Sequence, residues 1–129
     1  MRQITKRLRQ GQDLREEVER LVGEHDIKAG VIASLVGGLQ KASFRMPDGK
    51  TVENWNEPLE IVSGTGTLSK DDCHVHVSAS KKDGSVVGGH LKPGCIVKET
   101  VEVVLLVFDD VEYVRKPDET TGYDELEIN

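Results

Sequence analysis

The sequence predicts an α+β fold: a single domain with a mostly antiparallel, curved sheet and one main helix. Two observations lead to this prediction. One amphipathic helical repeat occurs early in the chain, and six or seven β-forming runs follow or precede it, separated by turn residues. The length of 129 residues suits one domain with its own core, which we expect to cover residues 1–129.

The first predicted strand is short and basic. Residues 1–10 alternate loosely between apolar and polar side chains, which is typical of an edge strand with a solvated face. The alternative interpretation of this basic face is a small anion-binding site near Arg7 and Arg9.

The main helix is expected from about Leu14 to Glu24, where apolar residues recur at i, i+4, i+7 and i+8. Asp13, with Glu16 three residues later, forms an N-cap signature. The polar face of this helix is expected to be solvated surface. His25 falls at the helix end, where a cation is mildly favoured, so we expect it to lie outside any functional site.

Two apolar runs supply the interior of the predicted sheet. Residues 30–39 are almost continuously apolar, which predicts a strand buried on both faces. Residues 101–108 form the most strongly β-forming stretch and predict a central strand. Between them, residues 50–57 surround the lone Trp55 and suit a loop or a short edge strand that closes over an apolar surface.

Residues 58–68 predict a further strand that contains two glycines. Gly64 and Gly66 lack both the third glycine and the following helix that a dinucleotide-binding fingerprint requires. We therefore interpret them as marks of a bulge or of tight strand packing.

The segment from Cys73 to Leu91 carries most of the chain's chemistry, because it holds three of the four histidines. His74 and His76 lie two residues apart in an alternating run, so both rings leave the same face of a strand, with backbones roughly 6.6 Å apart. Cys73 shares the opposite face with the apolar residues and is therefore a poor candidate ligand.

The turn between the two halves of this segment decides whether His90 joins the other histidines. A two-residue turn at residues 83–84 places His90 opposite Val77, on the wrong face. A three-residue loop at residues 82–84 places it opposite His76, and three imidazoles then converge. Cross-strand partners have Cβ atoms about 5 Å apart, which lets both reach one ion at about 2.0 to 2.1 Å. The spacing leaves both turns open, and the alternative to a metal site is three polar residues on a solvated face.

Charge is concentrated at one end of the chain. Residues 109–129, an acidic C-terminal tail, hold eight acidic and two basic residues, so their net charge of −6 equals that of the whole chain. The first 108 residues are balanced, with fifteen basic and fifteen acidic residues, and do not resemble a basic nucleic-acid-binding footprint, which argues against DNA as a partner.

The remaining composition favours a cytoplasmic protein. No apolar run approaches the roughly 20 residues that span a bilayer, and no hydrophobic region follows the charged N-terminus, so we expect no membrane association. Two cysteines, Cys73 and Cys95, fit a reducing compartment as small buried side chains.

Several segments, spread over nearly the whole chain, match one known family in their order. The most specific are Gly88-Gly89-His90-Leu91 and the upstream His74-Val75-His76. The others are residues 11–14, 31–37, 59–65 and 102–104. Together they resemble the PPC domain, which is conserved in plants and prokaryotes, in its stand-alone prokaryotic form.

The resemblance implies a compact α+β domain with a central antiparallel sheet that assembles as a homotrimer. It also implies a metal ion, zinc first and another divalent metal second, bound by His74, His76 and His90 near the subunit interface. Plant relatives join the domain to an AT-hook, an Arg-Gly-Arg-Pro segment that enters the DNA minor groove, and this sequence contains no such segment.

Two classes of function follow. The first is a trimeric metal-binding protein with a small-molecule role, hydrolysis included, because three imidazoles leave a fourth position of zinc open for a small molecule or anion. Glu57 and Glu60 are candidates for a general base there, or else ordinary strand-surface residues. The second is a regulatory or interaction scaffold, or a DNA-binding protein by analogy with the AT-hook relatives.

Overall fold

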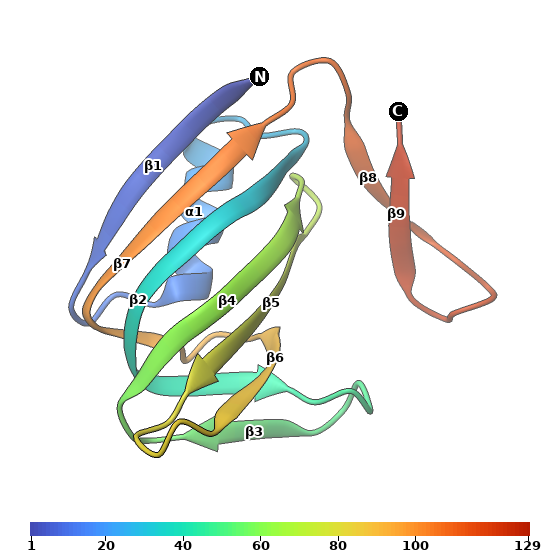
Figure 1. Cartoon of the computed structure of the whole chain (residues 1–129). Coiled ribbons are helices and arrows are strands. Elements are labelled where there is room, and N and C mark those ends of the chain that lie inside the picture. The colour runs from blue at the N-terminus through green and yellow to red at the C-terminus, as the bar shows by residue number, and fades with distance from the viewer.

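The computed structural model describes all 129 residues, as one helix, a seven-stranded sheet and a separate two-stranded hairpin (Figure 1). In chain order the elements are β1 (Arg2–Arg9), α1 (Leu14–Glu24), β2 (Gly30–Arg45), β3 (Val52–Trp55), β4 (Leu59–Leu68), β5 (Cys73–Ser80), β6 (Val86–Leu91), β7 (Ile96–Val107), β8 (Tyr113–Pro117) and β9 (Asp124–Ile128).

The main sheet has the strand order β1-β7-β2-β4-β5-β6, with β3 paired to β2, and its pairings are antiparallel. This arrangement confirms the predicted mostly antiparallel sheet with one helix. β1 is an edge strand and β7 lies inside the sheet, both as predicted.

β2 organises the sheet because it is 16 residues long and changes partners along its length. Its first part pairs with β7 and β4, and its last part pairs with β3 and β6. Since β4 pairs with β5 and β5 with β6, the strands β2, β4, β5 and β6 form a closed ring. The curvature of the sheet follows from this closure, together with irregularities in the β2–β7 register.

α1 covers one face of the sheet and has the predicted bounds. Its apolar stripe is buried in a core cluster of 25 residues. The side chain of Asp13 accepts a hydrogen bond from the backbone N–H of Glu16 at 3.1 Å, as expected of the N-cap. His25 is the C-cap residue of this helix. No helix of the protein combines the length and the apolar character needed to cross a membrane.

The prediction that residues 30–39 are buried on both faces is wrong. Ile32 and Leu35 are buried, but Val36 is 52% exposed. The physical reason is that α1 covers only one face of the sheet, so the other face of β2 is open. β3 behaves as predicted for residues 50–57, since Trp55 packs on Phe44 with ring centroids 5.7 Å apart.

The acidic C-terminal tail forms the hairpin β8–β9, which stands apart from the main sheet (Figure 1). Two backbone N–H groups attach its first strand to the body: the N–H of Tyr113 donates to the carbonyl of Lys28, and the N–H of Arg115 donates to the carboxylate of Asp71, both at 3.0 Å. The far end of the hairpin is exposed.

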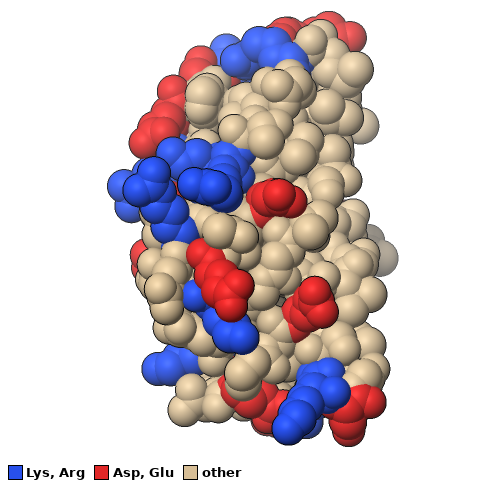
Figure 2. All heavy atoms as spheres, turned by 60° about the vertical axis from the view of Figure 1, so that its left-hand side comes forward, with Lys and Arg blue, Asp and Glu red and all other residues tan.

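Figure 2 shows the side of the molecule that carries β1, where Lys and Arg side chains gather in patches, the largest at mid-height, with acidic and uncharged side chains between the patches. Arg2 at the start of β1 forms an ion pair with Asp109. Arg7 and Arg9 are exposed and lie four strands away from β5 in the sheet order. The anion site suggested for these two arginines is therefore separate from the histidines.

Candidate metal centre

His74, His76 and His90 come together on neighbouring strands of the sheet. Of the two turns that the sequence allows, the structure has the three-residue loop at residues 82–84. The N–H of Lys81 donates to the carbonyl of Ser85 at 2.8 Å, and Gly84 takes a left-handed φ of +86°. His76 is consequently the direct cross-strand partner of His90.

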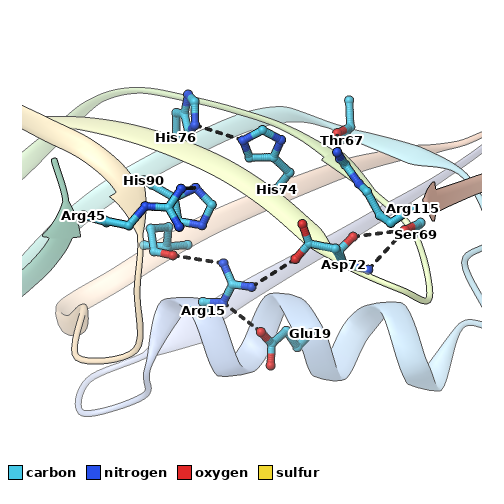
Figure 3. A network of polar contacts seen from close by, with 11 residues as sticks. Arg15, Glu19, Arg45, Thr67, Ser69, Asp72, His74, His76, His90 and Arg115 are labelled. Carbon is cyan, nitrogen blue, oxygen red and sulfur yellow. Dashed lines mark hydrogen bonds and ion pairs between the residues drawn. The ribbon is translucent and has the colours of Figure 1, made fainter. Parts of the chain in front are cut away.

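The ring nitrogens of the three histidines are close enough to share one ion. Their ligand atoms all lie within 4.8 Å of one another, and Nε2 of His74 is 3.1 Å from Nε2 of His76 (Figure 3). In a tetrahedral zinc site with bonds of about 2.0 to 2.1 Å, neighbouring ligand atoms are about 3.3 to 3.4 Å apart. Small side-chain rotations, of His90 above all, would bring the three to that spacing.

The opposite face of β5 holds this strand in place. Cys73, Val75, Val77 and Ala79 alternate with the histidines and are all buried in the core. Burial raises the pKa of the Cys73 thiol to about 11, so the group is protonated at neutral pH. Cys73 thus lies away from the histidine face, as predicted.

The environment favours the neutral, metal-binding form of two histidines. Burial, followed by the charge of Arg45, lowers the pKa of His90 to about 4. Burial, followed by the neighbouring His76 and Arg115, also lowers the pKa of His74. Both rings therefore offer unprotonated nitrogens at neutral pH, which is the form that binds metal.

Arg45 is a site residue that sequence reasoning missed. It ends β2, where it is the cross-strand partner of His90, and its Nη2 lies 3.5 Å from Nδ1 of His90. The only signal in the sequence is the position of an arginine after an apolar strand. Its partner cannot be recognised without knowing that β2 closes the ring against β6.

Arg15 links α1 to the end of β6 and corrects the expectation that the polar helix face is only solvated surface. Its guanidinium donates to the carbonyl of Leu91 at 2.9 Å, lies 3.5 Å from the carboxylate of Asp72 and donates to Glu19 at 2.8 Å (Figure 3). The Arg15 side chain is only 14% exposed. These contacts hold the residue that follows His90.

The two carboxylates considered as general bases lie elsewhere. Glu60 faces Ser80, four residues along β5 from His76, or about 13 Å of strand. Glu57 lies 3.9 Å from the ammonium group of Lys81. The structure brings neither carboxylate to the histidines.

The outer face beside His74 and His76 is hollowed into a shallow, open depression. It is lined by Val31, Thr65, Gly66, Thr67, His74 and His76. At its border Arg115 reaches from β8 and donates from Nη2 to the hydroxyl of Thr67 at 3.1 Å. Arg115 is the second site residue without a sequence signal, because it comes from the hairpin β8–β9.

Comparison with known families gives one match along most of the chain. The model of the Plants and Prokaryotes Conserved (PCC) domain matches residues 1–109. The match includes the three histidines and Arg45, whereas the hairpin β8–β9 lies beyond it.

Among curated proteins, the bifunctional protein GlmU of Synechococcus sp. (strain JA-2-3B'a(2-13)) is 40% identical over 122 residues. The similarity covers 95% of this chain and 19% of GlmU. The chain spans about a fifth of the length of the curated relatives it matches.

Solved structures share the whole fold. A hypothetical protein from Salmonella enterica has a TM-score of 0.96 at 30% identity, covering 99% of this chain and 93% of that one. A metal-containing protein from Archaeoglobus fulgidus has a TM-score of 0.84 at 32% identity, covering 98% and 94%. A candidate DNA-binding protein from Bacteroides thetaiotaomicron has a TM-score of 0.87 at 19% identity, covering 97% and 91%, and this likeness concerns the fold alone.

Proposed function

Because the chain belongs to the Plants and Prokaryotes Conserved domain family, we propose that it binds one divalent metal ion, zinc by preference, through His74, His76 and His90. The observation that carries this proposal is the convergence of three imidazoles whose ligand atoms lie within 4.8 Å of one another. The metal-containing relative from Archaeoglobus fulgidus, at 32% identity, supports it.

The donor set fits such an ion. Three imidazole nitrogens suit zinc, and also copper, nickel and iron, better than magnesium or calcium, which prefer oxygen ligands. The lowered pKa of His90 and of His74 keeps these ligands free of protons at neutral pH. Zinc is our first choice because three imidazoles with one open position are a common arrangement for catalytic zinc.

The proposed role is small-molecule chemistry, with hydrolysis as one form of it. A zinc ion held by three protein ligands supplies Lewis acidity at its remaining position. The open outer face beside His74 and His76 gives a small molecule access to that position. A metal closed off by a fourth protein ligand would instead favour a structural role in an interaction scaffold.

We further propose that the protein is a homotrimer. Two strand edges support an assembly: β1 has a partner only on its β7 side, and β9 only on its β8 side. β1 carries four basic residues and β9 three acidic ones, and they lie on opposite sides of the molecule in Figure 1. Unpaired edges of opposite charge suit a head-to-tail contact, which closes into a ring when the rotation between neighbours allows.

The test is the zinc content of the purified, untagged protein after dialysis against zinc, measured together with its mass in solution. We expect about one zinc per chain and a particle of three times the chain mass of 14.2 kDa. His76→Ala and His90→Ala should each lose the bound zinc, because two remaining imidazoles hold it far more weakly. His25→Ala, which alters the helix cap, is the matched control and should keep full occupancy. Full zinc in both site variants would overturn the proposal.

A further inference from the structure

Arg45 adds a positive charge directly beside the histidines. Its guanidinium lies next to the His90 ring in Figure 3, and the Nη2 to Nδ1 distance is 3.5 Å. A cation at this place opposes the binding of a divalent metal ion. Because Arg45 would weaken metal binding electrostatically, metal binding alone does not explain why it lies beside the histidines.

The charge of Arg45 has no acidic partner in the protein. None of the ion pairs involves Arg45, although the chain has six more acidic than basic residues. Its Nε is buried and makes no hydrogen bond. A part-buried guanidinium in this state costs free energy that an anion beside it would offset.

Binding of a metal by His90 would remove the hydrogen bond that Arg45 does make. A guanidinium only donates hydrogen bonds, so Nδ1 of His90 must accept this one. A metal on Nδ1 occupies the lone pair that accepts it. A metal on Nε2 requires the proton on Nδ1, which then faces Arg45 as a second donor. In both cases Arg45 is left without an acceptor while the metal is bound.

We propose that this acceptor is the carboxylate of a small-molecule ligand, and that the site is therefore specific for carboxylic acids. A guanidinium carries paired N–H donors that match the two oxygens of a carboxylate. Nη2 is the donor of Arg45 that borders His90. A carboxylate bound there lies next to the open position of the metal, where the rest of the molecule can react.

Arg115 places a second positive charge near the histidines, on the side of His74. Its Nε is also buried without a hydrogen bond, and it takes part in no side-chain ion pair. Thr67, which accepts from its Nη2, is the cross-strand partner of His74. An anionic ligand is thus favoured at both ends of the row of histidines.

This inference rests on the proposed metal site, so the experiment reports on the two separately. The protein is first titrated with Co²⁺, whose visible absorption reports coordination, and the Co²⁺-loaded protein is then titrated with acetate. Cobalt binding that is lost in His76→Ala supports the metal site, and its absence in the wild type overturns both proposals. Normal cobalt binding without any acetate response overturns the carboxylate proposal alone.

Variants of Arg45 sharpen the second titration. Arg45→Met should weaken acetate binding by about tenfold or more, because a charge-assisted pair of hydrogen bonds is lost. Arg45→Lys keeps the charge but loses the paired donors, so its acetate affinity should lie between that of the wild type and that of Arg45→Met. The affinity for Co²⁺ should stay the same or rise in Arg45→Met, since a like charge is removed.

The exposed Arg20→Met on α1 is the matched control and should leave both titrations unchanged. Equal acetate affinity in Arg45→Met and wild type would overturn the proposal. So would a loss of Co²⁺ binding in Arg45→Met, which would mean that Arg45 supports the shape of the metal site. Inorganic phosphate is tested in parallel, and binding tighter than that of acetate would contradict specificity for carboxylates.

Discussion

The two hairpins β5–β6 and β8–β9 both turn with a left-handed glycine but differ in the packing of their strands. Both turns contain a left-handed glycine, Gly84 with φ +86° and Gly122 with φ +78°. One face of β5 is buried throughout, whereas neither β8 nor β9 contains a buried residue. β5–β6 also pairs with β4 and β2 on its two outer edges, while β8–β9 pairs only with itself.

This difference shows what a hairpin needs in order to hold ligands at defined distances. A turn sets the register of two strands, and both hairpins have a turn that does so. Only a packed reverse face and paired edges keep the strands from twisting and fraying. The histidines therefore lie on the hairpin that has this support.

The largest loss of folding stability is expected where the hairpin β5–β6 meets β2. A Cβ on Gly89 would lie 2.6 Å from the carbonyl oxygen of Arg45 and 3.1 Å from Cβ of Phe44. Gly89→Ala should therefore lower the free energy of unfolding by about 3 kcal/mol, since backbone must move. Urea unfolding measures this loss. Gly23→Ala, in α1 with nothing within 4 Å of the new atom, is the control and should stabilise slightly.

The two turn glycines give a direct comparison of the hairpins. Alanine at Gly84 or Gly122 meets no other atom within 4 Å but must adopt a left-handed φ, which costs about 1 kcal/mol. Gly84→Ala should lower global stability by that amount. Gly122→Ala should leave global unfolding unchanged and speed hydrogen exchange in β9, because this hairpin opens on its own. Equal losses of global stability would show that both hairpins unfold with the core.

Lowering the pH should destabilise the folded protein through protonation of His90 on the hairpin β5–β6. The pKa of His90 is lowered from 6.5 to about 4 in the folded protein, so the unfolded chain binds its proton first as pH falls. This contribution to stability is complete above about pH 6.5 and is lost as the pH drops toward 4. In metal-free protein, the fall in melting temperature between pH 7 and 4 should be smaller in His90→Gln. An unchanged pH profile would show that His90 titrates normally.

The smallest change in folding stability is expected in the hairpin β8–β9. Ile128 on β9 is 67% exposed. In the dissociated monomer, Ile128→Ala should change the free energy of unfolding by less than about 0.5 kcal/mol, as for most surface positions. A larger loss in the urea midpoint, growing with protein concentration, would reveal that Ile128 is buried in an assembly.

Local patterns in the sequence were sufficient for much of this structure. The helix bounds, the Asp13 cap and the edge position of β1 all follow from contacts within a few residues or from simple alternation. The convergence of the histidines also depends on a local event, the choice of loop at residues 82–84. The spacing could not decide that choice, because the turn residues are compatible with either length.

What the sequence could not predict depends on pairings between distant segments. Val36 lies in an apolar run, yet its exposure depends on which face α1 covers. Arg45 meets His90 only because the end of β2 pairs with β6, and Arg115 reaches Thr67 only through the C-terminal hairpin. Neither pairing leaves a periodic signal in the sequence around these residues.

The closed ring of β2, β4, β5 and β6 also bears on the order of events during folding. The three histidines lie within seventeen consecutive residues, so only a short loop must close to bring them together. Arg45 is separated from His90 by 45 residues and arrives only when the ring closes. If the proposed sites are correct, the groups for the metal would meet through a short loop, whereas the group for the anion would join them only when the ring closes.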